Sequence, residues 1–174
     1  MKKILALFFA TSSVAVMADG LSNSNLYVGV GAGAGWNDVQ SPAATFRLNG
    51  GYNWTDNWAV ELGDTLLTQS GGGPDQSMSY YDLSIKGTVA VSQVLSLFAQ
   101  VGGAYGDPGA IGTYQAPGSG VNYLQGGWNF LTAAGLQFNL TRQVSLNLTD
   151  YYYYGSPTPQ GNTDVLLGGV KYNF

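Results

Sequence analysis

Residues 164–174 read DVLLGGVKYNF and end on an aromatic side chain. In an extended strand, successive side chains point to opposite faces. One face then carries four apolar side chains and a glycine, namely Leu166, Gly168, Val170, Tyr172 and Phe174. Lys171 and Asn173 fall on the other face. An apolar outer face and a polar inner face predict a strand that closes a membrane-spanning β-barrel.

The composition supports this interpretation. Of the 174 residues, 45% are hydrophobic and only 9% are charged, which is too apolar for an ordinary soluble surface. Beyond residue 18, no run approaches the roughly 20 apolar residues that a membrane-spanning helix needs. Strands in which apolar and polar residues alternate are the remaining way for a chain to be this apolar without long apolar runs.

Residues 1–18 have the pattern of a secretory signal peptide: two lysines, an apolar core and a small-residue cleavage site before Asp19. A membrane anchor is the alternative, but the core is short and no stop-transfer pattern follows. We expect removal of this segment, leaving residues 19–25 as a short periplasmic lead-in and residues 26–174 as the transmembrane barrel.

The charge and the missing residue types exclude several classes of function. Six basic residues less Lys2 and Lys3 leave four against ten acidic ones, so the mature formal charge is −6 and nucleic acid is not an expected partner. The chain has no Cys and no His. It therefore lacks thiolate chemistry, the commonest general base and the commonest metal ligand.

We expect no enzyme, cofactor or metal site. Hydrolases and acyltransferases generally need a nucleophile that a base activates, usually His. No Ser has a convincing Asp or Lys partner in the sequence. Asp75, Asp107 and Asp164 lie in separate loops, without the clustered spacing of calcium loops.

Period-two alternation recurs in eight segments: residues 26–36, 45–54, 58–65, 79–89, 95–105, 128–140, 144–154 and 164–174. Three short turns, near Thr55, Val91 and Thr141, alternate with four longer loops that begin at Asn37, Ser70, Gly106 and Gly155. This pattern predicts an all-β, eight-stranded, antiparallel up-and-down barrel with both termini on the periplasmic side. Alternate glycines in residues 26–36 are expected to make room for long side chains inside the barrel.

Aromatic side chains fall into two groups, one at each end of the predicted barrel. Trp54, Trp58, Phe138 and Phe174 lie beside the short turns, and Trp36, Tyr105, Trp128 and Tyr154 lie beside the longer loops. Two aromatic girdles at the membrane interfaces are the expected result. The alternative, a soluble sandwich with a core of aromatic residues, predicts no sorting by end.

Charged residues on the inward face predict an interior polar network of Arg47, Glu61, Asp82, Lys86 and Lys171. A hairpin symmetric about residue 73 or 74 sets Glu61 opposite Lys86. The turn at Thr55 sets Arg47 opposite Thr65 and so near Asp82. The two resulting ion pairs either fill a lumen that is too narrow for anything else, or gate a small-solute path.

Asp64 and Asp150 do not fit the alternation, because strict period two turns both toward lipid. We expect a β-bulge near Gly63 or near Thr149 to rotate at least one of them inward.

The ordered motifs resemble the eight-stranded outer-membrane barrels of Gram-negative bacteria, which include the OmpA transmembrane domain and the opacity-type surface antigens. The quoted stretches are LYVGVG at 26–31, GYNW and WAVELG at 51–54 and 58–63, GLQFNL before VSL at 135–140 and 144–146, and VKYNF at 170–174. The resemblance implies the cell outer membrane and a barrel-assembly signal in Val170, Tyr172 and Phe174. The sequence departs from that of full-length OmpA after the barrel, so we do not expect the cell-wall tether that a peptidoglycan-binding domain would give.

The expected role is structural or surface-interacting, with a narrow gated pore as the alternative. Residues 106–125, which include Tyr114 and Tyr123, contact a host molecule or a neighbouring surface protein, or serve only as a mobile cap. Other expected partners are outer-membrane lipid, lipopolysaccharide and the barrel-assembly machinery. Closure leaves no free strand edge, so a monomer is expected.

Overall fold

The structure, a computed structural model, describes residues 25–37, 40–69, 76–107, 127–155 and 162–174. The predicted signal peptide and most of the lead-in lie outside these residues. Most of the loop predicted at residues 106–125 also lies outside them. Within the described residues, no helix has the length and apolarity needed to cross a membrane.

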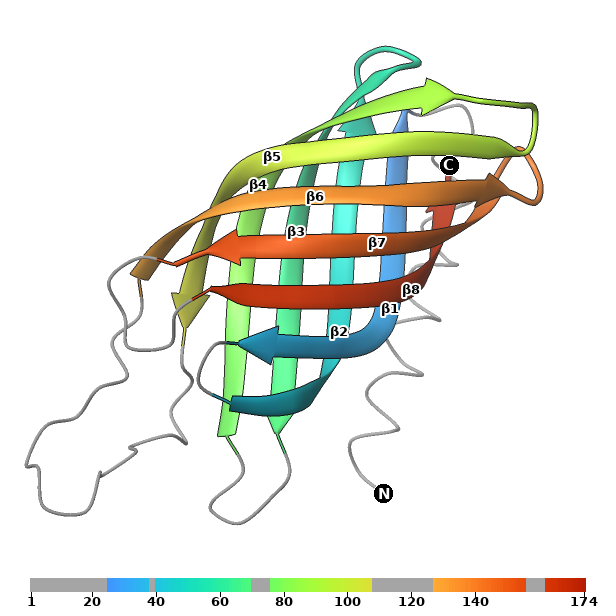
Figure 1. The fold of residues 1–174 in the computed structure, drawn as a ribbon. Helices are drawn as coiled ribbons and strands as arrows, with labels where there is room; N and C mark the ends of the chain where they lie inside the picture. Colours follow the sequence, from blue (N-terminus) through green and yellow to red (C-terminus); the bar gives the residue numbers. More distant parts are fainter. Residues whose placement is uncertain (1–24, 38–39, 70–75, 108–126, 156–161) are drawn as a thin grey trace, which may run out of the picture.

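Eight strands form a closed antiparallel barrel (Figure 1). Their bounds are β1 Leu26–Asn37, β2 Gln40–Asn53, β3 Trp58–Gln69, β4 Gln76–Ala90, β5 Leu95–Asp107, β6 Gly127–Asn139, β7 Val144–Tyr154 and β8 Thr163–Asn173. Each strand pairs with its neighbours in sequence, and β8 pairs with β1 from Asn173 opposite Tyr27 to Thr163 opposite Asn37. The predicted fold is confirmed.

Strand β2 begins earlier than predicted, at Gln40, so that only residues 38 and 39 separate it from β1. The first of the four predicted longer loops is therefore a short connection. Pro42 lies in this extension, and the β1–β2 register shifts between Gly35 and Asn37. Proline cannot donate to the ladder, which explains both an irregular pairing here and a strand that the sequence pattern hides.

The two ends of the barrel differ in their connections. The turn end carries residues 54–57, 91–94 and 140–143, and the loop end carries the other four connections. At the turn end, the amide of Phe174 donates to the carbonyl of Leu26 at 3.0 Å, so the barrel's first and last residues meet there.

All three connections of the turn end share one hydroxyl motif. Thr55, Ser92 and Thr141 each accept hydrogen bonds through the side-chain oxygen from the amides two and three residues on, at 2.9–3.3 Å. Each hydroxyl replaces a ladder partner for amides that leave the sheet. The turn chemistry therefore depends on a Ser or Thr at the second position after the end of the strand.

Burial is inverted relative to a soluble protein. Leu62 and Val89 are each 64% exposed, whereas Arg47 and Glu61 are 4% and 1% exposed. Strands alternate in this way all round the barrel, as an apolar surface outside and side-chain filling inside require. The interior therefore contains the polar groups that a soluble domain would present to water.

The predicted girdle aromatics lie on the outer surface. Trp36, Trp54, Trp58, Tyr105, Trp128, Phe138 and Tyr154 are all at least 40% exposed, and Phe174 is half-buried. At the loop end, Tyr105 and Trp128 are cross-strand partners with ring centroids 5.6 Å apart. At the turn end, the Trp58 ring covers its partner Gly87, a pairing that protects an outward-facing strand glycine.

The predicted bulge is wrong. The ladders run without a shift through Gly63 and Asp64 and through Thr149 and Asp150, and both aspartates are exposed on the outer face. An interrupted ladder leaves backbone groups unpaired in lipid, at several kcal/mol each. A lipid-facing carboxylate costs less than the roughly 2–4 kcal/mol of a midplane Arg or Lys, so the regular ladder wins.

Candidate functional site

The barrel interior has two layers, and the loop-end layer is apolar. Its members come from seven of the eight strands: Ala43, Leu67, Met78, Tyr80, Ala104, Leu131, Ala133, Tyr151, Tyr153, Val165 and Leu167. Leu131, Tyr153 and Val165 are fully buried. The alternation pattern predicts a polar network inside the barrel but no separate apolar layer, so this layer is a finding of the structure.

Two stacked tyrosines cross the lumen within the apolar layer. The rings of Tyr80 and Tyr153, from β4 and β7, lie 4.2 Å apart with an interplanar angle of 17°. Their hydroxyls are bonded, Tyr80 with Thr163 at 2.9 Å and Tyr153 with Thr65 at 2.9 Å. The stack therefore joins opposite walls and leaves no polar tip unpaired.

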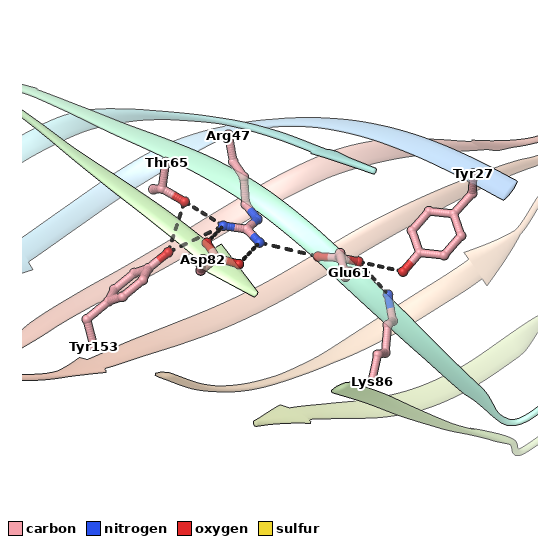
Figure 2. Close-up of polar contacts among 7 residues, drawn as sticks. All are labelled: Tyr27, Arg47, Glu61, Thr65, Asp82, Lys86 and Tyr153. Atoms are coloured by element: carbon pink, nitrogen blue, oxygen red, sulfur yellow. Dashed lines mark hydrogen bonds and ion pairs between the residues drawn. The ribbon is translucent and has the colours of Figure 1, made fainter. Parts of the chain in front are cut away.

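Arg47 lies next to this layer, on its turn-end side, and is the centre of the polar network (Figure 2). Its Nη1 and Nη2 donate to the two carboxylate oxygens of Asp82 at 2.6 and 2.9 Å. Nη1 also donates to the hydroxyl of Thr65 at 2.6 Å and to that of Tyr153 at 3.4 Å. A bidentate guanidinium–carboxylate pair is both strong and fixed in orientation.

A glycine makes room for the guanidinium. A Cβ at Gly63 would collide with Cζ and both terminal nitrogens of Arg47. The Arg47 Cζ also lies 4.4 Å from the centroid of the Tyr151 ring. The same device operates where Tyr27 covers Gly51 and where Phe98 covers Gly135. Inward glycines therefore accommodate large side chains from neighbouring strands.

Glu61 connects Arg47 to the turn-end half of the interior. Its Oε1 accepts from Arg47 Nη2 at 3.3 Å, and its Oε2 accepts from the Tyr27 hydroxyl at 2.8 Å. The Nζ of Lys86 lies 3.8 Å from the same Oε2, within ion-pair range but too far for a hydrogen bond. The structure thus brings both predicted ion pairs together, one tight and one loose.

The predicted register of the β3–β4 hairpin is wrong by two residues, because Glu61 pairs with Ser84 and not with Lys86. A two-residue shift keeps every side chain on its face. Lys86 therefore still points inward and reaches Glu61 diagonally. The β2–β3 register is as predicted, with Arg47 opposite Thr65.

Lys171 points inward but stays apart from the carboxylates. It is 7% exposed, and its Nζ lies 4.9 Å from the centroid of the Tyr27 ring. Among the described residues, no carboxylate is within ion-pair distance of it. The outward neighbours Tyr172 and Phe174 form an edge-to-face pair at 5.3 Å, and Val170 is 44% exposed.

Sequence reasoning missed the tyrosines that complete the network. Tyr27 and Tyr153 stand at inward positions of β1 and β7, and each hydroxyl bonds a network residue. Period two alone marks both as inward, but it cannot show how far a ring reaches across the lumen. In the described part of the chain, no three acidic, His or Cys side chains converge as a metal site.

Comparison with solved structures shows the same fold in other outer-membrane proteins. Neisserial surface protein A is 15% identical, with a TM-score of 0.67 over 87% of this chain and 98% of that one. The attachment invasion locus protein Ail of Yersinia pestis is 17% identical (TM-score 0.56, 87% and 97% covered), and it has also been solved with the heparin analogue sucrose octasulfate. The outer-membrane enzyme PagL is 18% identical (TM-score 0.55, 85% and 99% covered).

No curated protein sequence matches the chain significantly. Residues 4–174, nearly the whole chain, match the family described as the outer membrane protein beta-barrel domain. The inverted burial, the closed eight-stranded sheet and this match agree. The chain therefore belongs to the outer-membrane protein β-barrel domain family, which resides in the outer membrane of Gram-negative bacteria.

Proposed function

We propose that this protein is a non-conducting barrel whose role is structural and surface-interacting. The observation that carries the proposal is the apolar layer between the loop end and the polar network. An ion that crosses the lumen must leave water and pass Leu131, Val165 and the Tyr80–Tyr153 stack, and desolvating an isolated charge is very costly. A sealed lumen of this kind requires no conformational change.

Planar-bilayer recording of refolded mature protein tests it. We expect no steady conductance from wild type. A matched pair of variants separates the layer from the network: Leu131→Ser introduces a hydroxyl into the dry layer, and Leu83→Ser introduces one on the outer face, where Leu83 is 54% exposed. Only Leu131→Ser should raise the leak current across the bilayer. Reproducible single-channel steps in wild type would contradict a sealed lumen.

Surface contacts are assigned to the connections of the loop end. Residues 38–39, 70–75, 108–126 and 156–161 contain no Lys or Arg. Ail was solved with a sulfated sugar analogue, whereas the present chain offers no basic loop residue to such an anion. We propose that residues 106–125 contact a host or neighbouring surface protein through tyrosine and small polar side chains, and not a sulfated polysaccharide.

Replacing residues 106–125 by a short turn tests the contact role. Cell adhesion should fall while barrel yield and heat-modifiable mobility stay the same. The matched control shortens the connection at 70–75 instead. Unchanged adhesion after the first replacement would identify residues 106–125 as a cap only.

A narrow gated pore is the second candidate, because Glu61 is shared between two cations, Arg47 and Lys86. Its carboxylate contacts Arg47 at 3.3 Å and Lys86 at 3.8 Å, so small rotations exchange one partner for the other. In this candidate, Lys86→Ala alters open probability. Conductance that is identical in wild type and Lys86→Ala, or absent in both, would remove the gate.

We propose no catalysis for this chain. PagL shows that an enzyme can be built on this barrel. The present sequence has neither the His nor the Cys that most acyl hydrolases use. Purified protein incubated with lipopolysaccharide should release no fatty acid, and measurable release would overturn this assignment.

Export and assembly complete the proposal. Cleavage before Asp19 gives a mature chain with a periplasmic turn end, and Val170, Tyr172 and Phe174 present the signal to the assembly machinery. Intact-mass analysis of protein from outer membranes tests the cleavage, and loss of surface yield on deletion of Phe174 tests the signal. Closure of β1 on β8 favours a monomer in lipopolysaccharide-containing membranes, which native mass spectrometry checks.

A further inference from the structure

The interior of the barrel carries an excess positive charge. Among the described residues, its charged side chains are the cations Arg47, Lys86 and Lys171 and the carboxylates Glu61 and Asp82, all at most 7% exposed. Three cations against two carboxylates leave one positive charge uncompensated. A buried charge without a counter-charge is unfavourable, and the interior can relieve it either by releasing a lysine proton or by binding an anion.

The two carboxylates are already occupied by other donors. Both oxygens of Asp82 accept from Arg47. The oxygens of Glu61 accept from Arg47 and Tyr27. Lys86 remains at 3.8 Å from Glu61, and Lys171 has no carboxylate partner among the described residues. The excess charge is therefore located on the two lysines.

Both ammonium groups lie near the ring of Tyr27. The Nζ atoms of Lys171 and Lys86 are 4.9 and 5.8 Å from the centroid of Tyr27. The ring itself lies against the wall at Gly51, where a Cβ would collide with Cζ of Tyr27. The two nitrogens are no farther apart than the sum of their distances to the centroid.

A buried amide lies beside Lys86. Gln100 is the direct cross-strand partner of Lys86 on the inward face, and it is 4% exposed. Neither Nε2 nor Oε1 of Gln100 has a hydrogen-bond partner among the described residues. A buried amide donor without an acceptor is costly, and an anion between it and the lysines would satisfy it.

We propose that the turn-end half of the lumen binds a small inorganic anion of the size of chloride, held by Lys171 and Lys86 with the amide of Gln100. An eight-stranded interior is almost filled by side chains, so a larger anion does not fit. The apolar layer occupies the loop-end half, so the anion enters from the turn end. Binding neutralises the interior and stabilises the folded barrel.

Chloride-35 line broadening on refolded protein in a zwitterionic detergent tests the site. We expect saturable broadening that bromide displaces. Lys171→Met should weaken chloride binding by more than about tenfold, as loss of one charge from a buried pair does. Arg142→Met, which removes the exposed cation of a turn, should leave it unchanged.

A second measurement does not depend on the variant folding well. The urea midpoint of wild type should be higher in chloride than in gluconate at equal ionic strength. Gln137 Oε1 and Asn147 Oδ1 also have no partner among the described residues, and in the competing arrangement they accept hydrogen bonds from Lys171. If they satisfy it, wild type shows neither saturable broadening nor a midpoint shift, and the proposal is overturned. Broadening that persists in Lys171→Met also overturns it.

Discussion

Replacing Arg47 by methionine removes the centre of the interior network while keeping most of the side-chain volume. The change deletes two bonds to Asp82 and leaves that carboxylate buried, at 4% exposure, without its cation. It also removes one of the two hydrogen-bond donors to Glu61. Breaking a buried ion pair by removing one partner costs about 3–5 kcal/mol, so we expect a loss of that size in unfolding free energy.

Lys86→Met provides the internal comparison. Glu61 keeps Arg47 at 3.3 Å and Tyr27 at 2.8 Å when Lys86 is gone, so the loss should be only about 1 kcal/mol, the worth of one ordinary contact. The double variant Arg47→Met/Asp82→Leu should recover much of the Arg47→Met loss, because the carboxylate that Arg47→Met leaves unpaired is removed as well. The structure therefore predicts an order as well as a magnitude.

Urea unfolding in phospholipid vesicles, followed by the fluorescence of the four tryptophans, measures these differences. Arg142→Met, in an exposed turn, is the control and should fall within about 0.5 kcal/mol of wild type. Equal losses for Arg47→Met and Lys86→Met would refute the reasoning, because they would mean that solvent, and not Arg47, balances the two carboxylates.

Three further changes follow from other parts of the barrel. Gly63→Ala should lower the urea midpoint, because a Cβ there displaces the Arg47 guanidinium, whereas Gly168→Ala, with nothing within 4 Å, should not. Asp150→Leu should raise unfolding free energy by about 1–2 kcal/mol, since it removes a lipid-facing carboxylate; an unchanged value would imply that a partner already compensates it. Thr141→Ala should lower it by about 1 kcal/mol through the lost turn bonds, and Thr141→Ser should restore it.

Period two is a local property, and for that reason the sequence alone determined the closed eight-stranded fold, the outward and inward faces and the inward positions of the charged residues. The contact between Glu61 and Lys86 was predicted correctly even though the assumed hairpin register was wrong. A register shift of two residues keeps each side chain on the same face of the sheet. The extension of β2 past Pro42 escaped the pattern, since proline interrupts the strand signal without ending the strand.

Only the tertiary structure decided how the interior is divided. Which side chains meet across the lumen depends on the stagger of all eight strands, and no local window contains that information. The stagger stacks Tyr80 on Tyr153 and places the apolar layer on the loop-end side of Arg47. It also turns Lys171 toward Tyr27 and away from the carboxylates. It also keeps Asp64 and Asp150 facing lipid, because an unbroken ladder outweighs the penalty of an exposed carboxylate.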